Sequence, residues 1–225
     1  MQLYIGNKNY SSWSLRPWLL MKHAGIAFEE VPLRLDFDAA SPFKTALAAV
    51  APSGKVPVLV DDGFAVWDTL AIAEYLAEKF PGKALWPDAT QARARARSLC
   101  TEMHGGFQSL RGACPMNIEA DLPEVGAQLL RDDPGLAQDL TRIDNMWTQQ
   151  LAASGGPFLF GAFSIVDAYY APVVTRIRTY ALPVAPAAAA YVERIFALPA
   201  MQQWVAAARA EHDFLPFDEP YRSQA

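Results

Sequence analysis

The sequence predicts an α/β region with a mixed four-stranded sheet, followed by a region built only of helices. Two observations carry this prediction. Strand-like and helix-like patterns alternate through the first 80 residues, and from Ala89 onward no convincing strand pattern occurs. A strand–helix–strand unit gives a parallel pair of strands, whereas a hairpin adds antiparallel ones. Because the first region contains both, its sheet is expected to be mixed.

The elements of the first region follow one another closely. Strands are expected at 3–5, 28–33, 56–60 and 64–67, and helices at 14–23, 42–50 and 69–80. Gly25 stands where a helix commonly ends in a left-handed residue. Asp61-Asp62-Gly63 has the composition of a tight hairpin turn. Four strands in this order, with helices on both faces, form the thioredoxin-like arrangement.

The second region reads as an all-α helical bundle. Helices are expected at 89–113, 123–130, 135–154, 165–180, 187–197 and 201–211, separated by proline and glycine breaks. Ser164 and Asp167 have the spacing of a capping box, so we assign them to folding rather than to catalysis. Since residues 83–88 lack any periodic pattern, the expected domains are 1–82 and 89–225.

Composition excludes several classes of protein. The 225 residues are 52% hydrophobic, enough for a buried core, but no run approaches the ~20 apolar residues that span a bilayer. The net charge is −5 and the basic residues form no block, so neither nucleic acid nor a membrane is an expected partner. The N-terminus lacks a secretory pattern, and the two cysteines have no metal or disulfide spacing. A cytoplasmic protein without a metal is therefore expected.

Three serines precede the first expected helix, in the loop Tyr10-Ser11-Ser12-Trp13-Ser14. One of them is expected to cap that helix, because serine is a favoured N-cap residue. Another could direct its hydroxyl toward a bound thiol. A hydrogen bond to a charged acceptor contributes ~1.5–3 kcal/mol, enough to favour the thiolate. Either interpretation is open from the residues alone.

Two further motifs each have a structural and a functional interpretation. Pro57 stands near the start of an apolar strand. Proline has no N–H group to donate to the hydrogen bonds between strands, so it is normally excluded from strand interiors. A cis Val56–Pro57 bond would turn the backbone of Val56 toward a peptide ligand, whereas a trans proline would only mark a strand edge.

Asp68 and Thr69 stand where a strand gives way to a helix. They could cap that helix, or hold an ammonium and a carboxylate group.

In this order and spacing, the three motifs resemble those of the glutathione transferase superfamily, over the whole chain. SSWSLRPWLL resembles the zeta-class motif, with an arginine five residues after its first serine. The resemblance implies that Ser11 is the catalytic serine, with Ser12 in that role if the loop register shifts. Trp13 replaces the zeta-class cysteine, which speaks against maleylacetoacetate isomerase activity.

The other two motifs supply the expected glutathione site. PSGKVPVLV resembles the family's cis-proline segment, and DTLAI resembles its Glu/Asp-Ser-x-Ala-Ile motif. The resemblance implies that the backbone of Val56, before Pro57, pairs with the cysteinyl group, and that Lys55 reaches the glycyl carboxylate. It also implies that Asp68 and Thr69 hold the γ-glutamyl end.

The expected pocket for the second substrate is lined by Trp13, Met103, Phe107 and Arg111. The last three are spaced by one helical turn, so they could share a face of the helix expected at 89–113. Arg111 could then receive an acidic group. An equally open interpretation places Met103 and Phe107 in the core and Arg111 on the surface.

These observations predict a glutathione transferase, in which a serine hydroxyl stabilises the glutathione thiolate for attack on a small electrophile. Conjugation or peroxide reduction is favoured over isomerisation. Two alternatives stay open: an isomerase of the maleylacetoacetate isomerase type, which uses glutathione as a cofactor, and a non-enzymatic glutathione-binding protein. The resemblance further implies a homodimer. Nothing in the sequence names the electrophile.

Overall fold

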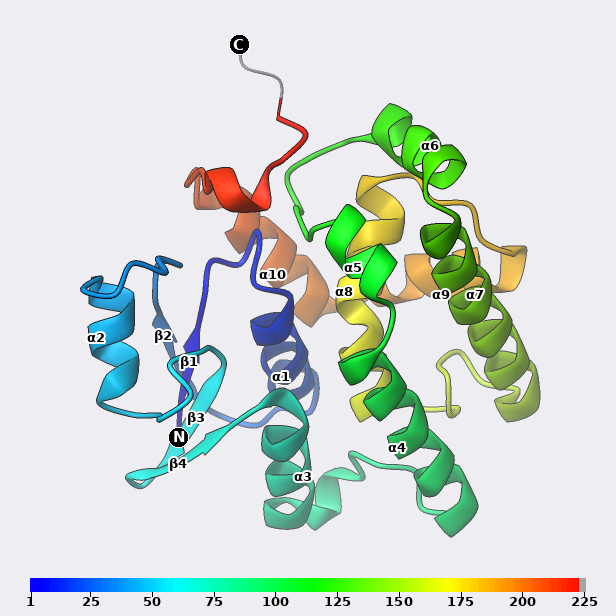
Figure 1. Ribbon diagram of the computed structural model, residues 1–225. Coiled ribbons are helices and arrows are strands. Elements are labelled where there is room, and N and C mark those ends of the chain that lie inside the picture. The colour runs from blue at the N-terminus through cyan, green and yellow to red at the C-terminus, as the bar shows by residue number, and fades with distance from the viewer. Residues whose placement is uncertain (223–225) are drawn as a thin grey trace.

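The computed structural model describes residues 1–222 and shows a small sheet packed beside a larger group of helices (Figure 1). The first part contains β1 (Gln2–Ile5), α1 (Ser12–His23), β2 (Glu29–Pro32), α2 (Pro42–Ala48), β3 (Val58–Asp61), β4 (Phe64–Trp67) and α3 (Thr69–Lys79). A 3-10 turn, η1 (Pro81–Lys83), follows. The second part contains α4 (Thr90–Gly105), α5 (Gln108–Ala113), α6 (Pro123–Asp132), α7 (Pro134–Ser154), α8 (Ile165–Thr179), α9 (Pro186–Ala197), α10 (Pro199–Ala210) and the 3-10 turn η2 (Pro216–Asp218).

The sheet confirms the predicted fold class. Its strand order is β2-β1-β3-β4, with β1 parallel to β2 and the other neighbours antiparallel. Asp62 and Gly63, in the turn between β3 and β4, have φ values of 48° and 86°. A tight hairpin turn with both central residues at positive φ matches the twist of the strands that it joins.

The two faces of the sheet are covered by different helices. Leu3, Ile5 and Leu59 are fully buried in the core that includes α1 and α3. Val58, the neighbour of Leu59, lies instead in a smaller cluster with Phe43 of α2. Because side chains alternate across a strand, this division follows directly from the sequence. Figure 1 shows α2 on one side of the strands and α1 and α3 on the other.

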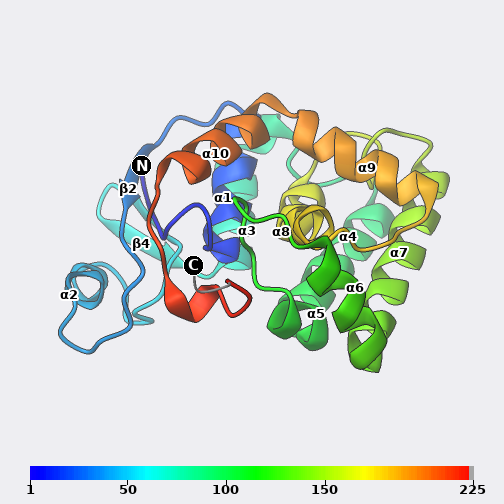
Figure 2. The ribbon, with the colours of Figure 1, turned by 90° about the horizontal axis from the view of Figure 1, so that it is seen from above.

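Helix α8 lies at the centre of the second part, and the view from above in Figure 2 shows other helices around it. Almost all of its residues are buried, as expected for a helix enclosed on every side. At its first turn the carboxylate of Asp167 accepts hydrogen bonds from Ser164 N (2.8 Å), Leu159 N (3.1 Å) and the hydroxyl of Tyr191 (3.0 Å). Asp167 and Ser164 therefore serve the fold, as predicted.

The prediction of one helix over 89–113 is wrong, because the chain forms two helices there. Helix α4 ends at Gly105, and Phe107 adopts a left-handed φ of 55° before α5 begins. A Cβ atom at Gly106 would lie 2.6 Å from the carbonyl oxygen of Glu102, so this junction requires glycine. The break changes the direction of the chain, so Met103, Phe107 and Arg111 do not share one helix face.

The division into domains at 1–82 and 89–225 stays a prediction. Every strand of the sheet ends before Asp68. However, one hydrophobic core runs from the sheet through α1 and α3 into the helical part, and it includes Leu85 and Trp86 of the expected linker. Among residues 1–222, no helix combines the length and the apolar character that crossing a bilayer needs.

Candidate functional site

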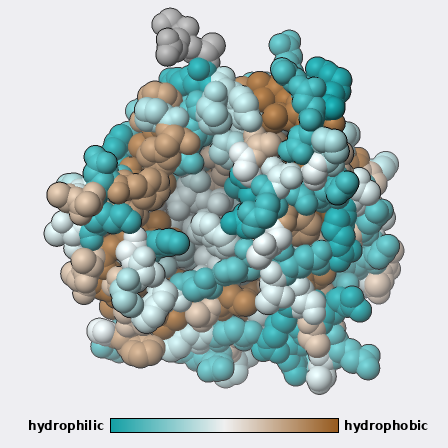
Figure 3. Space-filling model, viewed as in Figure 1, coloured by the Kyte–Doolittle hydropathy of each residue, from teal (hydrophilic) through white to brown (hydrophobic). Residues whose placement is uncertain are grey.

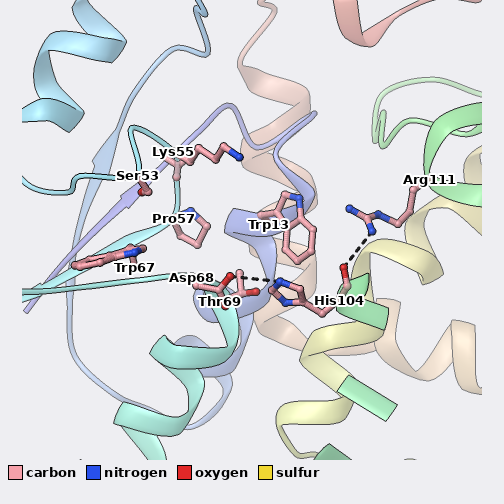
Figure 4. Close-up of a pocket in the computed structure, with 10 residues that line it drawn as sticks. Trp13, Ser53, Lys55, Pro57, Trp67, Asp68, Thr69, His104 and Arg111 are labelled. Atoms are coloured by element: carbon pink, nitrogen blue, oxygen red, sulfur yellow. Dashed lines mark hydrogen bonds and ion pairs between the residues drawn. The ribbon is translucent and has the colours of Figure 1, made fainter. Parts of the chain in front are cut away.

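Two adjoining cavities lie between the sheet and the helical part. The smaller, of about 410 Å³, is lined by Trp13, Ser53, Lys55, Val56, Pro57, Trp67, Asp68, Thr69, His104 and Arg111. The larger, of about 560 Å³, shares Trp13, Lys55, Val56 and Arg111 and adds Ser11 and Ser12. Figure 3 shows the molecule hollowed near the middle of this face, and Figure 4 shows the side chains around the smaller cavity. Motifs far apart in the sequence therefore meet at one place.

The peptide bond between Val56 and Pro57 is cis, as the first of the two interpretations requires, and pairing of Val56 with a peptide stays a prediction. Strand β3 begins only at Val58, so the backbone of Val56 lies outside the hydrogen-bonded ladder. Val56 lines both cavities. Its N–H and C=O groups can therefore meet an extended peptide.

The N-terminus of α3 points at the smaller cavity. The carboxylate of Asp68 accepts a hydrogen bond from Leu70 N at 2.9 Å, so Asp68 caps this helix. Asp68 has a φ of 73°, a conformation that non-glycine residues adopt rarely and mainly at functional sites. Thr69 is buried, and its hydroxyl lies 2.9 Å from the hydroxyl of Tyr169. Capping and ligand binding are therefore compatible here, since capping uses only Oδ1 of Asp68 and Asp68 lines the smaller cavity.

His104 is a residue of this site that the sequence did not reveal. Its Nε2 lies 3.4 Å from Asp68 Oδ2 (Figure 4). Its Nδ1 lies 2.9 Å from the hydroxyl of Tyr169. Its ring packs against Trp13, with 5.1 Å between the ring centroids. The sequence alone favours a structural or exposed role for His104, since nothing in it places this residue against a nucleophile. No spacing in the sequence signals this cluster.

The serine loop differs from expectation in one respect. Ser11 occupies the N-cap position of α1, but its side chain makes no capping hydrogen bond. Its Oγ lies 2.7 Å from Ser14 Oγ, and Ser14 Oγ accepts a hydrogen bond from Gly6 N at 3.1 Å. The expectation that a serine side chain caps this helix is therefore wrong at Ser11. Since that hydroxyl is not used for capping, it stays available at the wall of the larger cavity.

Residues 7–10, just before Ser11, are held by the second part of the chain. Glu211 accepts hydrogen bonds from Lys8 N (2.6 Å) and Asn9 N (3.1 Å). Asn9 also donates to Asn117 Oδ1 at 3.0 Å, and Trp204 donates to the carbonyl oxygen of Lys8 at 2.9 Å. A loop bonded on two sides presents Ser11 in a defined position.

Three guanidinium groups near the cavities have no carboxylate within 4.0 Å among residues 1–222: Arg16, Arg111 and Arg176. Arg16 and Arg176 are buried, and burial lowers the pKa of Arg16 to about 9 and that of Arg176 to about 10. Both therefore stay charged at neutral pH. Arg16 lies between the rings of Trp13 and Tyr169, at 3.9 and 4.7 Å from their centroids. This unpaired positive charge favours anions in the cavities.

The predicted pocket for the second substrate needs correction. Trp13 and Arg111 line both cavities, and Arg111 donates to the carbonyl oxygen of His104 at 3.2 Å. Met103 and Phe107 line neither cavity, because both are buried in the core. The break at Gly106–Phe107 ends α4, which contains Met103, before α5, which contains Arg111, so the shared face on which their assignment rested does not exist.

The two cysteines are buried and free. Burial raises the pKa of Cys114 to about 12 and that of Cys100 further still, so neither thiol ionises near neutrality. No cluster of three or more His, Cys, Asp or Glu side chains suited to a metal occurs among residues 1–222.

Two family models match the chain. Residues 10–79 match the N-terminal domain of glutathione S-transferase, and residues 117–194 match its C-terminal domain. Together they cover the serine loop, the cis-proline segment, the start of α3 and most of the helical part.

Individual relatives give the same picture. Maleylacetoacetate isomerase of Rattus norvegicus is 29% identical over 185 residues, 82% of this chain and 81% of that protein. The enzyme of the same name from Pseudomonas aeruginosa is 32% identical over 119 residues, 52% of this chain and 55% of that protein. A Burkholderia glutathione transferase homologue, solved with bound glutathione, superimposes with a TM-score of 0.66 at 26% identity, over 94% of this chain and 98% of that one.

Proposed function

The chain belongs to the glutathione S-transferase superfamily, with similarity to its zeta class, and on this premise we propose that Ser11 stabilises the thiolate of bound glutathione for attack on a small electrophile. The observation that carries the proposal is the position of the Ser11 hydroxyl. It stands at the N-terminus of α1, makes no capping bond there, and lines the cavity that adjoins the cis-proline segment. Ser12, which lines the same cavity, is the alternative donor.

Glutathione would lie extended across the smaller cavity. The backbone of Val56, before the cis bond to Pro57, would pair with the cysteinyl group, and Lys55 would reach the glycyl carboxylate. At the other end, Asp68 would accept from the α-ammonium of the γ-glutamyl group. The amide of Thr69, at the first position of α3, has no partner within its helix and would bind the α-carboxylate.

The magnitudes suffice for a thiolate near neutral pH. A free thiol has a pKa of ~8.5, and lowering it by ~2 requires roughly 2.7 kcal/mol. One hydroxyl hydrogen bond to a charged acceptor contributes ~1.5–3 kcal/mol, and the N-terminus of a helix adds ~0.3–1 kcal/mol. The buried charge of Arg16 acts in the same direction. No general base is therefore required.

The second substrate would occupy the larger cavity. Its wall combines aromatic side chains such as Phe43 with the guanidinium groups of Arg111 and Arg176. An electrophile with an apolar body and an acidic group fits this lining. We also propose that the protein is a cytoplasmic homodimer, as the family implies, which size-exclusion chromatography with light scattering would test.

Conjugation of glutathione to chlorodinitrobenzene tests the assigned serine. We expect Ser11→Ala to lower kcat/KM by roughly 10²-fold, the loss of ~2.7 kcal/mol of thiolate stabilisation. Ser12→Ala, at the next position, is the matched control and should keep most of the activity. If both variants keep the full rate, the serine mechanism is wrong. If only Ser12→Ala loses activity, the two serines exchange roles.

An isomerase that uses glutathione as a cofactor is the second candidate. Two observations favour it: several relatives are maleylacetoacetate isomerases, and the unpaired guanidinium groups suit an acidic substrate. Trp13, which stands where the zeta class has cysteine, speaks against it. Product analysis by mass separates the two functions, since an isomerase consumes no glutathione.

A further inference from the structure

Asp218 lines the larger cavity together with Ser11, Ser12 and Arg176. Asp218 is half-buried in η2. Among residues 1–222, its side chain accepts no hydrogen bond and has no cation within 4.0 Å. It is the only acidic residue in the lining of this cavity. A carboxyl group that is partly desolvated and unpaired requires an explanation, since buried acids are normally paired.

Asp218 is also held in place by the segment that carries it. Leu215, three residues earlier, is buried in the cluster that contains Tyr10 and Phe43. The hydroxyl of Tyr10 donates to the carbonyl oxygen of Asp213 at 3.1 Å and contacts the carboxylate of Glu219. Figure 2 shows this red C-terminal segment between the sheet and α5. The segment therefore ties Asp218 to the same loop that presents Ser11.

The surroundings of Asp218 make its protonated form more populated than that of an ordinary aspartic acid. Burial raises its pKa to about 6; the charge of Arg176 opposes this rise and that of Glu219 adds to it. A carboxyl group with a pKa close to the working pH is suited to general acid catalysis. On its other side, Asp218 also lines a separate hollow of about 210 Å³ with Asn117 and Tyr221.

We propose that Asp218 is a general acid that protonates carbon during conjugation of glutathione to an α,β-unsaturated carbonyl compound. The inference rests on the proposed function. The thiolate sulfur forms a bond to the β-carbon, and the alkene electron pair moves to give an enolate. The O–H bond of Asp218 then breaks and its proton forms the new C–H bond at the α-carbon. The resulting carboxylate regains a proton from water, and Arg176 offers positive charge for the enolate oxygen.

This proton decides between two products. While the enolate is unprotonated, it can rotate about its former double bond and expel the thiolate, which returns an isomerised alkene and free glutathione. Once the α-carbon is protonated, the conjugate can no longer expel the thiolate in this way. Asp218 would therefore make the protein a transferase where an otherwise identical site would isomerise.

The test compares two substrates in wild-type protein, Asp218→Asn and Asp218→Glu. Chlorodinitrobenzene loses chloride and needs no proton on carbon, whereas (Z)-benzylideneacetone needs one. Glu124→Gln, which removes an exposed carboxylate in the first turn of α6, is the matched control. Conjugate and (E)-benzylideneacetone are measured together by liquid chromatography, and thermal unfolding checks that each variant is folded.

We expect Asp218→Asn to lower the rate of conjugate formation from the enone by roughly 10²-fold, the usual effect of a general acid. Its rate with chlorodinitrobenzene should fall by a much smaller factor, because that substrate needs no proton on carbon, and the ratio of isomerised enone to conjugate should rise. Asp218→Glu should restore part of the enone rate. Equal losses on both substrates, an unchanged product ratio, or a wild-type protein that turns over the aryl halide but not the enone would each overturn the role of Asp218. A protein that turns over neither substrate overturns the proposed function and this inference with it.

Discussion

The hydroxyl oxygens of Ser11 and Ser14 lie 2.7 Å apart at the start of α1. Since Ser14 Oγ accepts the N–H of Gly6, its own proton can be donated to Ser11. The proton of Ser11 is then free to point into the larger cavity. In the opposite arrangement Ser11 would donate to Ser14 and have no proton for a thiolate. The arrangement in which Ser14 donates is therefore the one that activates Ser11.

Ser14→Ala should affect both activity and stability. The variant removes the acceptor of a buried N–H group, which costs ~1–3 kcal/mol in the free energy of unfolding. It also removes the donor that orients Ser11, so kcat/KM with chlorodinitrobenzene should fall. Urea unfolding and steady-state kinetics measure the two effects. A Ser14→Ala protein with full stability and full activity would show that this hydrogen bond has no role.

Asp68→Asn separates capping from charge. Asparagine caps helices about as well as aspartate, so the free energy of unfolding should change little. Because the negative charge that would receive the α-ammonium is lost, KM for glutathione should rise at least about tenfold, which corresponds to roughly 1.4 kcal/mol. Calorimetry with glutathione gives the same quantity directly. An unchanged affinity would remove Asp68 from the binding site.

Tyr169 and Tyr170 are adjacent on α8 but serve different purposes. The hydroxyl of Tyr169 joins Thr69 and His104 beside the smaller cavity, whereas that of Tyr170 donates to the carbonyl oxygen of Leu99 in the core. Tyr169→Phe should therefore weaken glutathione binding roughly fivefold, for the loss of ~1 kcal/mol of hydrogen bonding. Tyr170→Phe should lower thermal stability and leave the affinity unchanged. The reverse pattern would contradict this assignment.

Asp167→Ala should be the most destabilising of these substitutions. It leaves two buried N–H groups and the Tyr191 hydroxyl without an acceptor, so the free energy of unfolding should fall by more than ~3 kcal/mol. Asp133 caps α7 through two N–H groups at a half-exposed position, and Asp133→Ala should cost only ~1 kcal/mol. Urea unfolding of both variants measures the difference. A similar loss in the free energy of unfolding of the two variants would mean that the burial of Asp167 does not increase its contribution to stability.

Patterns of local sequence predicted most of the secondary structure because local forces determine it. The hairpin strand Phe64–Trp67 and the start of α3 at Thr69 agree with expectation, since a turn and a capping residue mark them. The break at Gly106–Phe107 was missed. The consecutive glycines Gly105 and Gly106, which are poor helix formers, are the local signal for it.

The site was predictable where a motif is continuous along the chain. The cis bond before Pro57 and the capping role of Asp68 belong to this class. His104 and Asp218 could not be found in the same way. Each acquires its surroundings from segments far away in the sequence, Asp68 and Tyr169 for the first and Arg176 for the second. Tertiary packing, rather than spacing, creates these contacts.

The central claim is that the Ser11 hydroxyl keeps the sulfur of bound glutathione ionised near neutral pH. Titration of the thiolate absorbance of glutathione bound to wild-type protein, Ser11→Ala and Ser12→Ala tests this claim most directly. The account predicts a pKa of roughly 6.5 for the thiol bound to wild-type protein and Ser12→Ala, and a return toward ~8.5 in Ser11→Ala. A bound thiol with the same pKa in wild-type protein and Ser11→Ala would contradict it.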